Sequence, residues 1–235
     1  GPAMNASLCI PMLLLTNAAF AGDACVSPLM PIPDHNQSGI AIPIESSAGA
    51  NELVESLSLS VEIDHPWVGD LQISLESPAG TTISLLDRPG IPSSGFPGPF
   101  GCGGRDLNAM FSDDATVPAE GACSFSAQPV IAGSVLPIQS LAAFMGEPAD
   151  GVWTLHVSDQ SAYDAGVLIN ACISMTTSIA CTPDLTGDGV LDFFDVSAFL
   201  SAYSAQDPAA DFTGDGQFDF FDVSAFLNAY SAGCP

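Results

Sequence analysis

The chain has 235 residues, and 47% of them are hydrophobic, which is enough apolar material for one or two folded domains. It carries 27 acidic residues against two arginines and no lysine, so its formal net charge is −25. This charge repels nucleic acid and anionic lipid, and it excludes both as partners. It suits divalent cations and a calcium-containing exterior.

Residues 1–24 allow two interpretations. An apolar run, Leu8–Leu15, precedes the small-residue motif Ala19-Phe20-Ala21, which is typical of a secretory signal peptide and its cleavage site. No Lys or Arg precedes that run. The alternative is an ordered strand that packs on its own domain or adds to a neighbouring copy, with Cys9 linking subunits. Under both interpretations the protein is secreted and has no membrane span in the mature chain.

Residues 25–176 follow the pattern of β-strands. Leu57, Leu59, Val61 and Ile63 alternate with polar residues, and similar alternation returns in 71–75 and 153–157. Clusters of Gly, Pro and Asp separate these runs about every ten residues. This pattern predicts an antiparallel β-sandwich, with stretches such as 88–100 as loops.

The same region resembles the P domain (Homo B) of proprotein convertases over residues 33–175. The resemblance implies a jelly-roll β-sandwich without catalytic residues. In convertases this domain follows a subtilisin-like protease and supports its folding, and bacterial secreted proteins also carry it without a protease. The motifs occur in the family's order: IDHPWVGDL at 63–71, LESPAGT at 75–81, LDRPG at 86–90, DLNAMFSDDA at 106–115, GVWTLHVSD at 151–159 and DAGVL at 164–168.

No catalytic constellation stands out in this domain. His65 and His156 lie in strand-like contexts that favour hydrogen-bonded structural roles, His35 stands apart from them, and no serine lies in a Gly-x-Ser-x-Gly motif. The chain is therefore predicted not to be an enzyme. Adjacent aspartates of a secreted sandwich are more often cation ligands or solvated residues than a hydrolytic pair. We predict a third calcium site that uses some of Asp64, Asp70, Asp113 and Asp114.

The C-terminal residues contain one motif written twice. DLTGDGVLDFFD at 184–195 returns as DFTGDGQFDFFD at 211–222. Aspartates at loop positions 1, 5, 9 and 12, with Gly189 and Gly216 at position 6, form the oxygen cage of an EF-hand-type calcium loop. Position 12 is Asp instead of the usual Glu, and position 3 is Thr. The predicted Ca²⁺ ligands are Asp184, Thr186, Asp188, the Val190 carbonyl, Asp192 and Asp195, then Asp211, Thr213, Asp215, the Gln217 carbonyl, Asp219 and Asp222.

An amphipathic helix follows each loop, and no clear helix precedes either one. Val196, Phe199, Leu200 and Tyr203 form one apolar stripe, and Val223, Phe226, Leu227 and Tyr230 repeat it. Helical periodicity places Phe193 near this stripe, in the core. It places Phe194 and Phe221 on the opposite face, where they form a candidate partner-binding surface or pack on the preceding domain.

Residues 181–235 resemble a type I dockerin, a paired loop–helix calcium module. Dockerins tether secreted proteins to a scaffold by binding cohesin domains, and the resemblance places the same aspartates as ligands. Loop positions 10 and 11, which read the partner in that family, are often small hydroxyl residues. Here they are Phe193-Phe194 and Phe220-Phe221, which argues against ordinary cohesin recognition. The predicted dockerin-like domain spans 177–235.

Seven cysteines indicate an oxidising compartment. The alternative, a cytosolic metal site, is disfavoured because the sequence has no C-x-x-C motif and no His–Cys cluster. Six cysteines allow 15 pairings. The domain boundaries favour Cys25–Cys172, Cys102–Cys123 and Cys181–Cys234, with Cys9 left over.

Two classes of function follow from these features. The first is a non-catalytic secreted calcium-binding protein whose sandwich and dockerin-like module mediate extracellular attachment to a protein partner, or assembly. The second is a subunit of an extracellular filament that polymerises through its N-terminal segment. A weaker third is an accessory domain of a secreted subtilisin-like protease.

Overall fold

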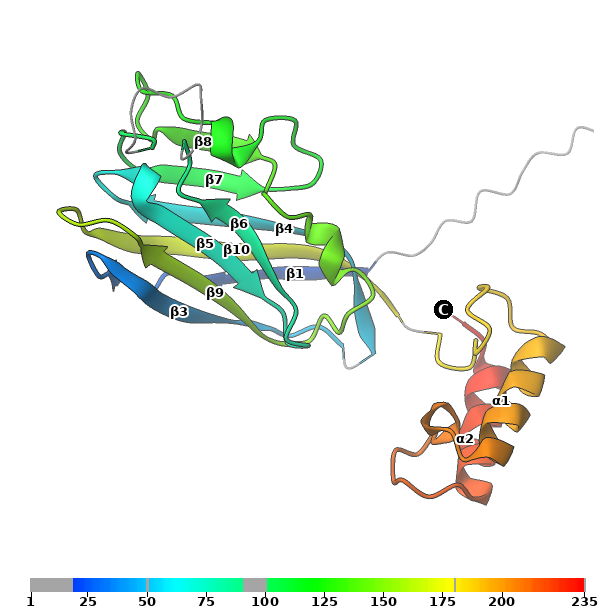
Figure 1. Cartoon of the computed structure of the whole chain (residues 1–235). Coiled ribbons are helices and arrows are strands. Elements are labelled where there is room, and N and C mark those ends of the chain that lie inside the picture. Colours follow the sequence, from blue (N-terminus) through cyan, green and yellow to red (C-terminus); the bar gives the residue numbers. More distant parts are fainter. Residues whose placement is uncertain (1–18, 50, 91–100, 180, 235) are drawn as a thin grey trace, which may run out of the picture.

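The computed structural model describes residues 19–49, 51–90, 101–179 and 181–234, and it is mainly β with two α-helices (Figure 1). Short 3₁₀ turns occur at η1 (Val68–Asp70), η2 (Ala119–Gly121), η3 (Leu141–Phe144) and η4 (Pro208–Ala210). The helices are α1 (Phe193–Ala205) and α2 (Phe220–Ala232). The strands are β1 (Ala19–Val26), β2 (Met30–Ile32), β3 (Asn36–Ser46), β4 (Glu52–Asp64), β5 (Leu71–Glu76), β6 (Thr82–Asp87), β7 (Leu107–Phe111), β8 (Ile131–Val135), β9 (Gly151–Asp159) and β10 (Gly166–Ile179).

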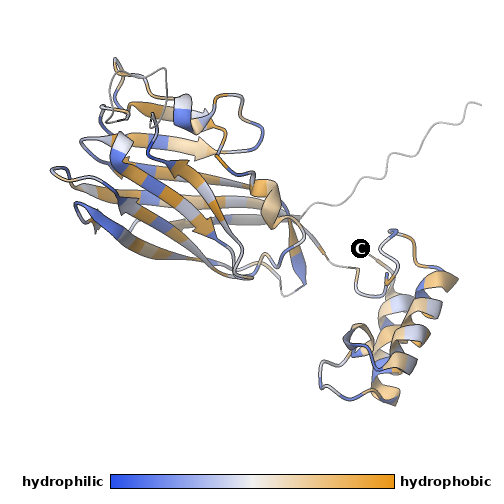
Figure 2. Ribbon diagram, in the orientation of Figure 1, coloured by the Kyte–Doolittle hydropathy of each residue, from blue (hydrophilic) through white to orange (hydrophobic). Residues whose placement is uncertain are grey.

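Two sheets pack face to face around one apolar core. The first has the order β1-β10-β4-β7-β8, with β2 also paired to β10, and the second has the order β3-β9-β5-β6. Along β4 and β5 alternate side chains are buried, as the two-residue period of a strand requires. Figure 2 shows the hydropathy of the residues along the strands. Leu59 from the first sheet and Leu75 and Trp153 from the second belong to the same buried cluster. The alternation in the sequence therefore predicted the inward faces correctly.

One pairing differs from the expected antiparallel arrangement. β7 and β8 pair in parallel, with Leu107 opposite Ile131 and Phe111 opposite Val135. A parallel pair requires a crossover connection instead of a tight hairpin. Residues 112–130 supply it, and they include η2. The strand pattern alone does not contain this information, because the period of two is the same in both pairings.

The described part of the N-terminal segment is a strand of the sandwich. β1 pairs with β10 from Ala19 opposite Thr177 to Val26 opposite Ala171, so residues 19–24 of the ambiguous segment belong to the first sheet. The predicted cleavage motif at 19–21 lies inside β1. The apolar run Leu8–Leu15 and Cys9 lie outside the described residues.

Three disulfides have the predicted pairing. Cys25–Cys172 joins β1 to β10, Cys102–Cys123 closes a loop beside β7, and Cys181–Cys234 joins the two ends of the C-terminal module. Such cross-links fit an oxidising extracellular environment. No helix in the described residues is long and apolar enough to cross a membrane.

The C-terminal module has a small aromatic core. α1 and α2 lie side by side (Figure 1), and the rings of Phe199 and Phe226 stack at 4.1 Å between centroids. Phe212 meets both rings edge-on, and Ala210 is buried with them. The hydroxyl of Tyr203 donates to the carbonyl of Phe218, which ties α1 to the second loop.

Candidate functional site

The first predicted calcium loop winds around the side chain of Asp184. Its carboxylate accepts hydrogen bonds from the backbone N–H groups of Gly187 (2.8 Å), Asp188 (3.3 Å) and Gly189 (2.7 Å). Gly187 and Gly189 have φ of 72° and 79°, in the left-handed region that favours glycine. The predicted sharp turn at Gly189 is therefore present, and a second one lies two residues earlier.

Asp195, at position 12, connects the loop to the helix. Its carboxylate accepts from the backbone N–H of Thr186 (3.1 Å), the hydroxyl of Thr186 (3.0 Å) and the backbone N–H of Asp192 (2.9 Å). Asp192 in turn caps α1, because its side chain accepts from the N–H of Phe194 at 2.7 Å. Asp192 and Asp195 therefore form a reciprocal capping box, which the sequence Asp-x-x-Asp at a helix start also indicates.

The second loop repeats this geometry. Asp211 accepts from Gly214, Asp215 and Gly216 at 2.8, 3.2 and 2.8 Å, and Asp222 accepts from Thr213 and Asp219 at 3.1 and 2.9 Å. Each of these distances agrees with its counterpart in the first loop to within 0.1 Å. The duplicated sequence thus gives a duplicated local structure, down to the individual acceptors.

The buried carboxylates of these loops favour the charged form. Asp195 and Asp222 are fully buried. The backbone N–H groups of Asp192 and Asp219, followed by the Thr186 and Thr213 donors, lower the pKa of Asp195 and Asp222 against the opposing effect of burial. The hydroxyl of Thr186 lies 3.2 Å from a carboxylate oxygen of Asp184 and 3.0 Å from one of Asp195. Two acidic groups therefore approach each other inside the first loop.

This donor set fits calcium in its chemistry. The predicted ligand atoms of both loops are all oxygens, which a hard cation such as calcium prefers. The carboxylates at position 12 are held ionised and point into their loops. Asp188 and Asp215 are exposed, and their carboxylates accept hydrogen bonds from the backbone N–H groups of Val190 and Gln217 within the same loops. Within the described ranges, no three His, Cys, Asp or Glu side chains lie close enough together to form a metal cluster.

Four phenylalanines at the helix starts are exposed. Phe194 and Phe221 are 66% and 67% exposed, on the outer face where the periodicity puts them. Phe193 is 74% exposed, so its predicted place in the core is wrong. It is the first residue of α1, where the helix has not yet reached the Phe199–Phe226 core. Leu200 and Leu227 are likewise exposed, since the small core admits only the centre of each stripe.

The four aspartates proposed for a third calcium site lie at two ends of the sandwich. Asp64 ends β4, and it is 3.7 Å from Arg105. Asp113 follows β7 at the opposite end of the β4–β7 pair, about 20 Å away at ~3.3 Å per residue. Its carboxylate accepts from Ser140, Leu141 and Ala142 at the start of η3. All four aspartates therefore cannot share one ion, and a site that uses some of them stays a prediction.

The remaining two members divide in the same way. Asp114 is exposed and follows Asp113, whereas Asp70 is buried in η1, near the end where Asp64 lies. The raised pKa of Asp70, about 6, arises first from its burial and then from the charge of Asp159. Asp159 is the last residue of the motif GVWTLHVSD, but it was not proposed as a site residue, because its pairing with His65 arises only through the fold.

Both strand-region histidines have the structural roles predicted for them. Nε2 of His65 is 3.1 Å from Asp159, and Nε2 of His156 is 3.2 Å from Glu76. The backbone N–H of Trp67 donates to Nδ1 of His65, so Nε2 of that ring carries the proton that bonds Asp159.

Comparisons with known proteins support the first of the two resemblances. The family model of the proprotein convertase P-domain matches residues 54–97. A calcium-dependent protease of Trichormus variabilis is 27% identical over 149 residues, which cover 62% of this chain and 17% of that protein. The chain thus spans about a sixth of the length of the curated relative it matches.

Two crystal structures of a serine protease of Aeromonas sobria are also similar at 20% identity, and each match covers 69% of this chain and 27% of the protease chain. The TM-score is 0.43 for its complex with the chaperone and 0.39 for the protease structure without it.

Proposed function

We propose that this chain is a non-catalytic, secreted attachment protein: a P-domain-like jelly-roll sandwich joined to a dockerin-like module that calcium orders. The observation that carries the proposal is the pair of C-terminal loops, which repeat the same aspartate acceptors on the same backbone donors. A module that keeps two such loops and presents four exposed phenylalanines serves binding better than it serves catalysis.

When bound, calcium would neutralise the loop aspartates. Asp184, Asp192 and Asp195 would hold one ion, and Asp211, Asp219 and Asp222 the other, with Asp188, Asp215, Thr186, Thr213 and the carbonyls of Val190 and Gln217 completing the two sets. With no Lys or Arg in the module, nothing else in it offsets these charges. The dissociation constant is on the order of 10⁻⁶ to 10⁻⁴ M, given a neutral group at position 3 and the shorter Asp at position 12.

Calorimetric titration of the full chain with calcium tests this site. We expect two ions per chain, and we expect the double variant D195N/D222N to lose both. The matched control is E45Q/D150N, which removes the same charge from two exposed acidic residues outside the loops. A stoichiometry below two in the parent, or unchanged binding in D195N/D222N, contradicts the proposal.

The exposed phenylalanines are the proposed partner surface. Phe194 and Phe221 lie away from the Phe199–Phe226 core, and leaving each ring in water forgoes roughly 1.5–3 kcal/mol. We expect F194S/F221S to bind calcium as the parent does, because both side chains lie outside the ligand sets. The variant should lose protein capture, self-association or docking on residues 25–176, as measured by light scattering and pull-down. Parent-like behaviour in all of these assays means that the rings are incidental.

A second candidate function is that of an accessory domain of a secreted protease. The observation that favours it is the 149-residue similarity to a calcium-dependent protease. In that case a subtilisin-like protease domain would reach its active form in higher yield when refolded with this chain. In neither case do we expect hydrolysis by the chain itself. Peptidase activity that copurifies with it and disappears on one Ser or Asp substitution would overturn this expectation.

A further inference from the structure

A cavity of about 440 Å³ opens at the end of the sandwich where β4 and β9 terminate. Its lining combines aromatic and acidic groups: His35, Trp67, Asp70, Ser161, Tyr163 and Asp164. Residues 160–164, between β9 and β10, form one wall, and η1 forms another. The cavity lies in the sandwich and is independent of the C-terminal loops.

The Asp70 carboxylate in this cavity is buried but poorly satisfied. The residue is 4% exposed, and Nη2 of Arg88 lies 4.0 Å from its Oδ1, which is too long for a hydrogen bond. Within the described chain Nε of Arg88 is buried without an acceptor, whereas the Asp70 side chain is 6% exposed. A buried carboxylate in this state is stabilised by any donor that enters the cavity.

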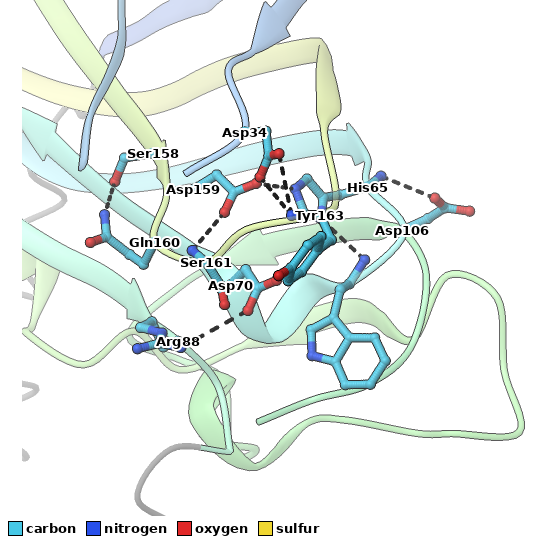
Figure 3. A network of polar contacts seen from close by, with 11 residues as sticks. Asp34, His65, Asp70, Arg88, Asp106, Ser158, Asp159, Gln160, Ser161 and Tyr163 are labelled. Carbon is cyan, nitrogen blue, oxygen red and sulfur yellow. Dashed lines mark hydrogen bonds and ion pairs between the residues drawn. The ribbon is translucent and has the colours of Figure 1, made fainter. Parts of the chain in front are cut away.

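The neighbouring carboxylates are already used to build the wall (Figure 3). Asp159 accepts from His65 and from the backbone N–H of Ser161, and Asp34 accepts from the backbone N–H of Tyr163 at 3.0 Å. Tyr163 has φ of 95°, a strained value for a residue with a side chain, and its ring is 96% exposed. Figure 3 shows this ring beside Asp70, on the side away from Arg88.

These features select the class of ligand. The carboxylates of Asp70 and Asp164 in the lining of the cavity call for a cation. Exposed aromatic rings favour a planar guanidinium, which stacks on them and donates from its edge. The chain has no lysine, and its two arginines already face Asp70 and Asp64.

We propose that this cavity binds an arginine side chain of a partner protein, with Tyr163 stacking on the guanidinium and Asp70 accepting its hydrogen bonds. The chain's net charge of −25 would attract a basic partner to this site over long range.

The test is binding of N-acetyl-arginine amide to the full chain, followed by NMR or calorimetry, with the citrulline analogue as the uncharged isostere. We expect the arginine probe to bind and the citrulline probe to bind about tenfold more weakly, a difference of ~1.4 kcal/mol. D70N should weaken arginine binding by a similar factor, and D114N, which removes the same charge at the other end of the sheet, should leave it unchanged.

Y163A keeps the test decisive if D70N does not fold, because an exposed ring contributes little to stability. We expect Y163A to weaken arginine binding while its unfolding transition matches the parent's. Equal binding of the two probes, or parent-like binding in both D70N and Y163A, overturns the proposal. Displacement of the arginine probe by excess calcium also overturns it, since the cavity would then be a metal site.

Discussion

The buried core of the sandwich contains 33 apolar residues, whereas the core of the C-terminal module contains Phe199, Ala210 and Phe226 among the described residues. The sandwich joins strands that are distant in sequence, and the module relies on hydrogen bonds between residues two to nine positions apart. A large core stabilises the first, which also contains two of the three disulfides. The second needs its disulfide and, in our proposal, its ions, because three buried residues remove little apolar surface from water.

Removal of calcium by a chelator should give the largest difference in stability between the C-terminal module and the sandwich. At a calcium concentration about 100 times the dissociation constant, each occupied site contributes about 2.7 kcal/mol, so two sites contribute about 5 kcal/mol to the module. We expect a chelator to abolish amide-exchange protection in α1 and α2 and to leave β4 and β10 protected. The D195N/D222N variant without chelator serves as the internal check. Loss of protection in both regions together would show that they do not differ as described.

Truncation of Trp153 should destabilise the sandwich and leave the C-terminal module unchanged. Its ring is fully buried, meets Phe144 edge-on at 5.1 Å and donates from Nε1 to the carbonyl of Ala149. We expect W153A to destabilise the sandwich by about 3–5 kcal/mol because it leaves a large cavity. The module's calcium-dependent transition should not move. A calorimetric scan at saturating calcium measures both, and a matching shift of the module's transition would contradict their independence.

The Asp70 site predicts a smaller, pH-dependent effect confined to the sandwich. The pKa of Asp70 is raised from 3.8 to about 6, so the folded state holds its proton more tightly than the unfolded state does. The stability from this group is present at low pH and is lost as pH rises through about 6. We expect D70N to gain up to about 3 kcal/mol on the parent between pH 4 and pH 7, measured by urea unfolding. D114N should show no such trend, and a pH-independent difference for D70N would refute the assignment.

Much of the fold was predictable because its causes are local. Strand alternation gave the inward faces of β4, β5 and β9, and domain boundaries gave the three disulfides. The parallel β7–β8 pair was not predictable, because alternation carries no strand direction. Phe193 was misplaced because a helical wheel ignores where a helix begins relative to its core.

The candidate sites also have a part that the sequence predicts and a part that only the fold reveals. Loop spacing placed the aspartates, and the structure adds the donors that hold them. Asp64, Asp70, Asp113 and Asp114 do not all lie together, because adjacency in sequence says nothing about which end of a strand pair a residue occupies. A calcium site that uses some of them stays a prediction. The cavity around Asp70 was not predicted at all, since Tyr163 and Ser161 lie beside Asp70 only through the tertiary fold.

The β4–β10 pair also sets the order of events during synthesis. Asp64 pairs with Val167 and Glu52 with Ile179, so the partners at the centre of the larger sheet are 103 to 127 residues apart (167 − 64 and 179 − 52). β4 therefore leaves the ribosome long before β10, and although β7 can pair with it earlier, its other edge stays unpaired until β10 is made. The loop–helix units need only neighbouring residues and form quickly once made. The slow step, and the one exposed to misassembly, belongs to the region that is sturdier once folded.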